Sequence, residues 1–192
     1  MFKEQIRPAI FSFLILTIIT GLLYPLAVTG IAQIFFHEQA NGSLIYRNGV
    51  PIGSSLIGQP FDDPKYFWAR PSATSAVPFN AASSSGSNLG PLNPALTAAI
   101  AERIKALKAA DPQNPAPVPV DLVTSSASGL DPHISLAAAY YQLPRVSRLR
   151  NLPQNVVETI LRRHTTGRFL AISGEPVVNV LQLNLALDEY KK

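Results

Sequence analysis

The chain has 192 residues, a formal net charge of +4 and no cysteine. The absence of cysteine excludes disulfide bonds and thiolate metal sites. The excess of basic residues is modest and is weak evidence about function.

An apolar stretch from Pro8 to Phe36 contains no Asp, Glu, Lys, Arg or His. A helix in a soluble core needs a polar face, and this stretch has none. As a helix it would run about 42 Å, more than the ~30 Å of bilayer hydrocarbon. Its Leu, Ile, Val and Phe residues favour insertion by roughly 4–7 kcal/mol. We therefore predict one membrane-spanning helix over residues 8–36, with a tolerated kink at Pro25, which follows Tyr24.

The charges that flank the span predict its orientation. Lys3 and Arg7 precede it, whereas the first basic residue beyond it is Arg47. This bias places residues 1–7 in the cytoplasm and residues 37–192 outside it. A domain outside the cytoplasm has no obvious nucleic-acid partner.

A cleaved secretory signal is the alternative interpretation of this stretch, with a small-x-small site at residues 27–29. The apolar character continues from Gly30 to Phe36, which favours an uncleaved anchor. Both interpretations place the rest of the chain across the membrane.

The remaining ~155 residues are enough for one globular domain. Asn48-Gly49 lies between two apolar runs and predicts a β-hairpin over residues 43–57. Asp63-Pro64 predicts the start of a short helix. The aromatic run from Tyr66 to Trp68 is assigned to the core, and a position at the membrane interface is the alternative.

Residues 70–93 are rich in Ser, Asn, Gly and Pro and carry no charge after Arg70. This composition is typical of flexible linkers. A structureless loop of this length inside a compact domain is uncommon. An ordered loop packed on a partner protein is therefore the competing hypothesis.

The second half of the chain predicts alternating helices and short strands. Asn93 as N-cap and Pro94 open a helix with Leu96, Ile100, Ile104 and Leu107 as its apolar stripe and Glu102, Lys105 and Lys108 facing water. Extended chain follows over 111–119, then a strand over 120–124 and a turn over 125–132. Next come a helix capped by Ser135 and broken or kinked at Pro144, a helix from Leu152-Pro153, a strand over 169–172 and a turn at Gly174. Residues 177–192 fit a strand or a helix, and Asn179 as N-cap with the Leu, Ala, Glu and Lys content favours a helix. The fold class expected is a single transmembrane helix followed by one mixed α/β (α+β) domain.

No residue pattern indicates an enzyme. His37, His133 and His164 are far apart and lack metal-ligand spacing, and the chain has no G-x-S-x-G elbow or glycine-rich phosphate loop. Ser128, Asp131 and His133 would suit a membrane-tethered hydrolase, but their order matches no known triad and such residues form ordinary turns. A module that binds a small ligand is a further alternative. The basic run from Arg145 to Arg168 predicts either a solvated face or a surface that docks on an acidic partner.

Several phrases taken together resemble the C subunit of the Kdp-type, potassium-transporting P-type ATPase of bacteria. They are Arg7-Pro8-Ala9, Gly21-x-x-Tyr24-Pro25, residues 39–44, Arg70-Pro-Ser-Ala-Thr74, residues 86–90 with Asn93-Pro94, residues 126–131, residues 142–146, and residues 174–179 through 185–188. The phrases cover almost the full length, in the family's order, with one anchor at the N-terminal end.

The resemblance implies a non-catalytic accessory subunit of a potassium uptake pump in the bacterial inner membrane. In this family a channel-like subunit passes the ion and a separate P-type subunit hydrolyses ATP. The C subunit lies beside the channel-like subunit with its domain over the external ion entrance, and it is described as a chaperone that raises the ATP affinity of the hydrolysing subunit. ATP, Mg²⁺ and K⁺ are then used by the partner subunits, and no cofactor is bound directly. The expected partner contacts are Tyr24, Pro25, Arg70, Ser87, Asn88, Leu89 and Arg145.

Overall fold

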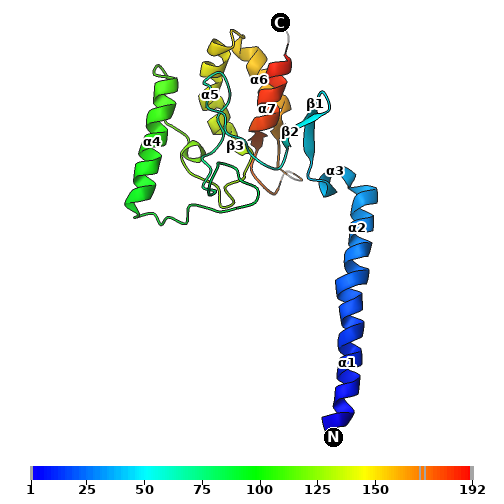
Figure 1. Ribbon diagram of the computed structural model, residues 1–192. Helices are drawn as coiled ribbons and strands as arrows, with labels where there is room; N and C mark the ends of the chain where they lie inside the picture. Colours follow the sequence, from blue (N-terminus) through cyan, green and yellow to red (C-terminus); the bar gives the residue numbers. More distant parts are fainter. Residues whose placement is uncertain (1, 169, 171, 191–192) are drawn as a thin grey trace. The chain divides into compact units, whose positions relative to one another are not determined.

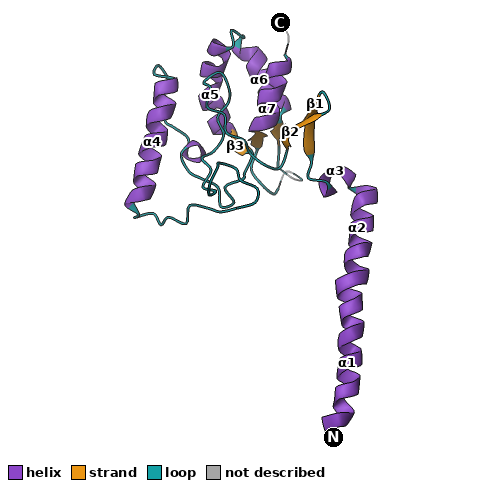
Figure 2. Ribbon diagram, viewed as in Figure 1, coloured by secondary structure: helices purple, strands orange, loops and turns teal. Residues whose placement is uncertain are grey.

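The structure is a computed structural model that describes residues 2–168, 170 and 172–190. The chain forms two compact units, Met1–Leu44 and Ile45–Lys192. We call the second unit the head. Figures 1 and 2 trace the elements of each unit along the chain.

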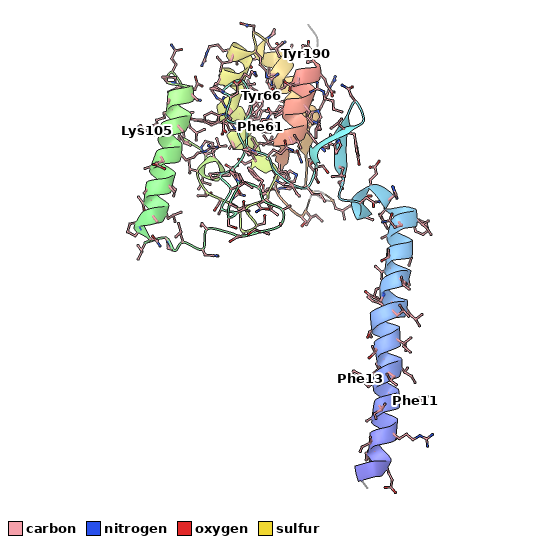
Figure 3. The ribbon with its side chains drawn as sticks, in the orientation of Figure 1. Phe11, Phe13, Phe61, Tyr66, Lys105 and Tyr190 are labelled. Carbon is pink, nitrogen blue, oxygen red and sulfur yellow. The ribbon has the colours of Figure 1, made fainter. Side chains whose placement is uncertain are left out.

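The first unit is built on a single long helix. Residues Glu4–Phe35 have a mean hydropathy of 2.2 and bury nothing inside the structure. Apolar side chains such as Phe11 and Phe13 project from it (Figure 3). The predicted span is therefore confirmed as a helix long and apolar enough to cross a membrane. A short helix, α3 (His37–Ala40), follows it.

A π-helical turn interrupts the long helix before Pro25. The helix consists of α1 (Phe2–Ile18), the π-turn η1 (Ile19–Leu23) and α2 (Tyr24–Phe35). The Tyr24 N–H donates to the Ile19 carbonyl, five residues back. Because proline has no N–H and its ring collides with the carbonyl four residues earlier, a wider turn relieves the conflict. The irregularity expected at Pro25 is present in this form.

The head begins with the predicted hairpin. Strands β1 (Leu44–Arg47) and β2 (Val50–Ser54) form a two-stranded sheet. Asn48 and Gly49 have φ angles of 51° and 78°. A type I′ turn requires positive φ at both central residues, which is why this dipeptide predicted the hairpin correctly.

A three-stranded antiparallel sheet lies at the base of the head's helices. Its strands are β3 (His133–Ser135), β5 (Val177–Asn179) and β4 (Thr165–Thr166), in the order β3-β5-β4. Val178 of the central strand pairs with Ile134 on one side and Thr165 on the other. β5 continues directly into α7 (Val180–Glu189).

The helices of the head begin at the predicted caps. The side chains of Asn93, Ser135 and Asn179 accept backbone N–H bonds of 2.9, 3.0 and 3.1 Å. They open α4 (Pro94–Ala110), α5 (Leu136–Leu149) and α7. Helices α5, α6 (Gln154–Arg163) and α7 pack side by side, whereas α4 lies at the edge of the head (Figure 1).

The structure corrects two predicted elements and resolves another. The helix expected at Asp63-Pro64 is wrong: the Asp63 carboxylate and carbonyl accept the N–H groups of Lys65 and Tyr66 and close a single turn. The strand expected over 120–124 is wrong, because Val120–Leu122 form a 3₁₀ turn. Pro144 lies inside one continuous helix, α5. The strand expected over 169–172 falls partly outside the described residues.

The core of the head forms around the aromatic run. Phe67, Trp68 and Ala69 are 0, 7 and 4% exposed, so their assignment to the core is confirmed. They pack with residues of the sheet and of α5, α6 and α7: Ile134, Ala138, Ala139, Val146, Val157, Leu161, Val178, Leu183 and Leu187. On α4, in contrast, only Leu107 of the predicted apolar stripe is fully buried.

Candidate subunit interface

Two irregular segments of the head, residues 70–90 and residues 124–131, are joined by hydrogen bonds. The Ser85 N–H and the Ser84 hydroxyl donate to the Ser128 carbonyl at 2.9 and 3.1 Å. The Ser72 hydroxyl donates to the Gly129 carbonyl at 2.7 Å. The first segment is therefore an ordered loop held by its own chain. We call the pair the interlocked loops.

Glycine permits the closest approach between these loops. A Cβ on Gly129 would lie 2.5 Å from the Ser85 carbonyl oxygen, and Gly129 has a φ of +67°. A Cβ on Gly86 would lie 2.9 Å from the Ala127 carbonyl oxygen. Both separations are too short for a side chain, so the two glycines are requirements of this packing.

Arg70, at the start of the first interlocked loop, binds Ser125 and Asp131 of the second loop. Its guanidinium lies 3.2 Å from the Asp131 carboxylate and donates to the Ser125 carbonyl at 3.2 Å. Burial favours a raised pKa for Asp131, but hydrogen bonds from His133 and the charges of His133 and Arg70 outweigh it and lower the pKa. Asp131 is thus a charged partner for Arg70 at neutral pH. Arg70, expected to contact a partner subunit, is half-buried and holds its own chain.

The three residues considered for a hydrolase do not form a triad. Asp131 lies 3.1 Å from the His133 ring, but it is shared with Arg70. The Ser128 hydroxyl accepts the Leu130 N–H at 3.1 Å and lies 3.4 Å from the Ser126 hydroxyl. Within the described residues no hydrogen bond links Ser128 to His133. The arrangement is that of a turn stabilised by its own side chains.

Arg145 lies in the core and not on a surface. It is 2% exposed, and its guanidinium lies 4.9 Å from the centre of the Trp68 ring. It donates to the Pro64 carbonyl and, at 2.7 Å, to the Gln142 side chain. Burial lowers its pKa to about 10, so it remains protonated at neutral pH. The expected role of Arg145 as a direct partner contact is corrected to a structural one, because this chain already encloses the side chain.

Two buried amides bind the backbone of the aromatic run. Asn184 accepts the Phe67 N–H and donates to the Phe67 carbonyl, both at 2.9 Å. Gln142 accepts the Trp68 N–H at 2.8 Å and donates to its carbonyl at 3.1 Å. Neither residue was predicted from the sequence. The available signal was a polar residue within the apolar run of each helix.

Arg103 attaches α4 to the rest of the head. It donates to the Leu122 carbonyl at 3.2 Å and to the Ala69 carbonyl at 3.0 Å. Its guanidinium lies 5.2 Å from the centre of the Trp68 ring. The role of Arg103 was not predicted from the sequence either, although a basic residue between Ile100 and Ile104 on an apolar stripe was a visible signal.

A groove of about 400 Å³ lies between α4 and the interlocked loops. We call it the α4 groove. Its lining is mostly apolar: Pro71, Ala73, Leu89, Leu96, Ala99, Ala106 and Val123, with Ser72, Ser87, Glu102, Arg103 and Ser125. Of the expected contacts, Ser87 and Leu89 thus line the groove, and Asn88 is exposed beside it. Tyr24 and Pro25 are exposed on the long helix of the other unit.

A family model described as KdpC, the c chain of the K⁺-transporting ATPase, matches residues 6–189. The chain belongs to the KdpC family. It is 60% identical over 190 residues to the potassium-transporting ATPase KdpC subunit of Dechloromonas aromatica, and the aligned region covers 99% of this chain and 100% of the relative. It is 62% identical over 185 residues to the KdpC subunit of Methylococcus capsulatus, which covers 96% and 97%.

KdpC membership confirms the resemblance found in the sequence. The chain is an accessory, non-catalytic subunit of a potassium-transporting ATPase, and the alternatives of a hydrolase and a ligand-binding module receive no support. Two of the phrases that carried the resemblance, residues 86–90 and 126–131, lie in the interlocked loops. Arg70, which begins another, joins those loops through Asp131. These KdpC phrases therefore specify one structural unit next to the α4 groove.

Most arginines of the basic run from Arg145 to Arg168 form ion pairs with carboxylates of the same chain. Arg148 and Arg150 pair with Asp111 and Asp188 at 2.6 and 2.9 Å. Arg162 and Arg168 pair with Glu158 and Glu175 at 2.7 and 3.0 Å. Such pairing favours the interpretation as a solvated face over a surface that docks on an acidic partner. Among the described residues no group of three His, Asp or Glu side chains is placed to hold a metal ion.

Proposed function

We propose that this chain is a single-pass subunit of a potassium uptake pump in the bacterial inner membrane, with residues 1–7 in the cytoplasm and the head outside. It stabilises assembly and supports activity through contacts, and performs no chemistry of its own. KdpC family membership over nearly the whole chain carries this proposal. The partners are a channel-like subunit that passes potassium, a P-type subunit that hydrolyses ATP, and the lipid bilayer.

Two features support the proposed topology. The helix over Glu4–Phe35 is long and apolar enough to cross a membrane, and its apolar side chains are not buried within the structure. Its flanking basic residues, Lys3 and Arg7, lie on the N-terminal side, which the positive-inside rule places in the cytoplasm.

With its head outside, the chain acts on ATP hydrolysis only at a distance. ATP, Mg²⁺ and K⁺ are bound by the partner subunits in this proposal, and the chain holds no cofactor directly. An effect on ATP affinity then travels through the long helix as a coupling free energy between states of the complex. We assign the lateral contact with the channel-like subunit to the face with Tyr24 and Pro25, and the external contact to Ser87, Asn88 and Leu89.

Affinity purification of the tagged full-length chain from bacterial membranes tests the assembly. We expect the channel-like and P-type subunits to co-purify in fixed ratio with it. A chain that purifies without either subunit would contradict the proposal.

Cysteine labelling tests the topology, because the natural chain has no cysteine. A membrane-impermeant maleimide added to intact cells with a permeable outer membrane should label Lys108→Cys in the head. It should leave Gln5→Cys unlabelled until the inner membrane is opened. The reverse pattern would overturn the proposed orientation.

A further inference from the structure

The α4 groove contains a half-buried cation without an anionic partner. Arg103 lines the groove, and within the described residues it forms no ion pair. The other half-buried arginines of the head, Arg70 and Arg150, each have a carboxylate within 3.2 Å. The fully buried Arg145 resembles Arg103 in being held by a carbonyl group and the Trp68 ring, but its side chain is enclosed by the core. The partners of Arg103 are two carbonyl groups and the Trp68 ring, which orient the guanidinium but do not neutralise its charge.

Part of the Arg103 guanidinium remains available to a ligand. Its Nε and Nη2 atoms donate to carbonyls of the head, whereas Nη1 makes no hydrogen bond in the described part of the chain. Nη1 is also not fully buried, so it remains accessible to a ligand. Burial lowers the pKa of Arg103 despite the charge of Asp62, so the cation is poorly solvated. Such a guanidinium favours a carboxylate, which can accept two of its hydrogen bonds.

The walls of the groove favour an apolar side chain. Leu89, Leu96 and Val123 line it and are each partly exposed. Leu92, in the turn before α4, is 95% exposed. Large apolar side chains that remain open beside a groove are typical of surfaces that a partner covers. The groove thus combines apolar walls with the guanidinium of Arg103. The Glu102 carboxylate also lines the groove but is exposed and, within the described residues, forms no ion pair with Arg103.

We propose that the α4 groove binds an acidic–apolar segment from an extracytoplasmic loop of a neighbouring pump subunit. A carboxylate of that segment pairs with Arg103, and an adjacent apolar side chain packs between Leu89, Leu96 and Val123. This inference rests on the proposed function, which supplies a neighbouring subunit on the same side of the membrane. The occupant is chosen by charge complementarity, because a neutral or basic segment would leave Arg103 unpaired or repel it.

Substitutions at Ala99 test the groove without removing Arg103, which also holds the fold. Ala99 is exposed, lines the groove and lies one helical turn before Arg103. In Ala99→Glu, the new carboxylate is placed to pair with Arg103 in an i,i+4 arrangement and competes with the partner's acid. Ala99→Gln adds the same bulk without charge. Ala98→Glu, exposed and outside the groove lining, is the matched control for charge and helix propensity.

The readout is the amount of the other pump subunits that co-purifies with each tagged full-length chain, at equal membrane expression. We expect Ala99→Glu to lower it at least about tenfold, Ala99→Gln to lower it clearly less, and Ala98→Glu to match wild type. Wild-type recovery for Ala99→Glu would overturn the inference. Equal losses for Ala99→Glu and Ala99→Gln would overturn the pairing with a carboxylate.

Crosslinking identifies the occupant in the assembled complex. Benzoylphenylalanine at position 99 should capture another pump subunit at a segment that carries Asp or Glu within a few residues of an apolar side chain. Capture of a second copy of this chain, or of lipid alone, would overturn the inference. If the wild-type chain co-purifies with no pump subunit, the proposed function fails. If the wild-type chain co-purifies with the pump subunits and the groove variants do so equally well, only the inference about the groove fails.

Discussion

Asn184 and Gln142 replace the backbone partners that the aromatic run would have in a sheet. Each side-chain amide both accepts from and donates to one backbone residue, Phe67 or Trp68. These backbone groups are buried, where an unsatisfied N–H or carbonyl is costly. The two amides therefore allow an irregular segment to cross the middle of the core.

Replacing Asn184 with alanine should lower the free energy of unfolding by about 3 kcal/mol, because it leaves two buried backbone groups without partners. Gln182→Ala, on the half-buried side of the same helix, should change it by less than about 0.5 kcal/mol. Urea denaturation of the full-length chain in detergent measures both values. Trp68, the only tryptophan, is 7% exposed and reports unfolding of the head by fluorescence. Equal effects of the two substitutions would contradict the role given to Asn184.

Asp131 should make the stability of the head sensitive to acid. Burial alone would raise its pKa, but the bonds from His133 and the charges of His133 and Arg70 bring it below the ordinary value of 3.8. The unfolded chain therefore binds this proton more readily than the folded chain. The stabilisation is present above about pH 3.8 and is lost as the pH falls through the folded-state pKa.

Asp131→Asn should remove this contribution to the pH dependence. We expect the variant to be less stable than wild type at pH 7, because Arg70 loses its carboxylate, and the two free energies of unfolding to converge between about pH 5 and pH 2. Urea denaturation at a series of pH values measures the convergence. A constant difference across that range would show that Asp131 does not carry the charge pairing.

The elements that the sequence predicted best are those specified by a local rule. Asn93, Ser135 and Asn179 opened helices as N-caps, and Asn48-Gly49 turned the hairpin, because each requirement is met within a few residues. The strands of the central sheet were missed or misplaced because each has at most three residues, too few to show alternation.

The interlocked loops depend on contacts between distant residues, which no local pattern reveals. Composition showed that residues 70–93 would be irregular, but not that they would be hydrogen-bonded to residues 124–131. Arg145 was misjudged for the same reason: a charged residue is usually exposed, and only the assembled core shows the carbonyl and the ring that hold it.

Gly129→Ala should separate the interlocked loops. Alanine at a φ of +67° is strained, and its Cβ would lie 2.5 Å from the Ser85 carbonyl oxygen. We expect the free energy of unfolding to fall by more than about 2 kcal/mol. Gly90→Ala is the matched control, because nothing lies within 4 Å of its added Cβ, and it should be neutral or slightly stabilising. Similar melting temperatures for the two variants would contradict the close packing of these loops.

The apolar stripe of α4 is only partly covered by the rest of the chain. The sequence of α4 has the apolar stripe of a core-facing helix, yet only Leu107 is fully buried. Glu102, Lys105 and Lys108 are exposed as predicted, and Figure 3 shows Lys105 on this helix. Hydrophobic periodicity identifies the face that needs cover, but not whether the cover comes from the same chain. In the proposed complex a neighbouring subunit supplies part of it.

At the scale of the whole molecule, the two units differ in where their apolar residues lie: the first unit exposes them along a helix, and the head buries them in a core. The buried hydrophobic residues all lie in the head, and no described residue of the first unit is buried. The first unit instead presents apolar side chains along the whole of its helix. A lipid environment satisfies that helix, whereas the head is stabilised by its own core. Composition alone predicted this division.

Removal of the long helix should therefore leave a folded head. A fragment of residues 41–192 keeps the hairpin, both sheets and the complete core. We expect it to be soluble and to unfold within about 1 kcal/mol of the full-length chain in detergent, because every residue of the hydrophobic core belongs to the fragment. Trp68 fluorescence during urea denaturation compares the two.

The same fragment should fail to support the pump when exported to the external side of the membrane. Without the helix, it loses the lateral contact and the high effective concentration that an anchor provides. Potassium uptake by cells that lack the full-length chain measures this loss, and the full-length chain expressed at the same level is the control. If the fragment restores uptake fully, the helix does not contribute to function, and contacts of the head alone account for the role of the subunit.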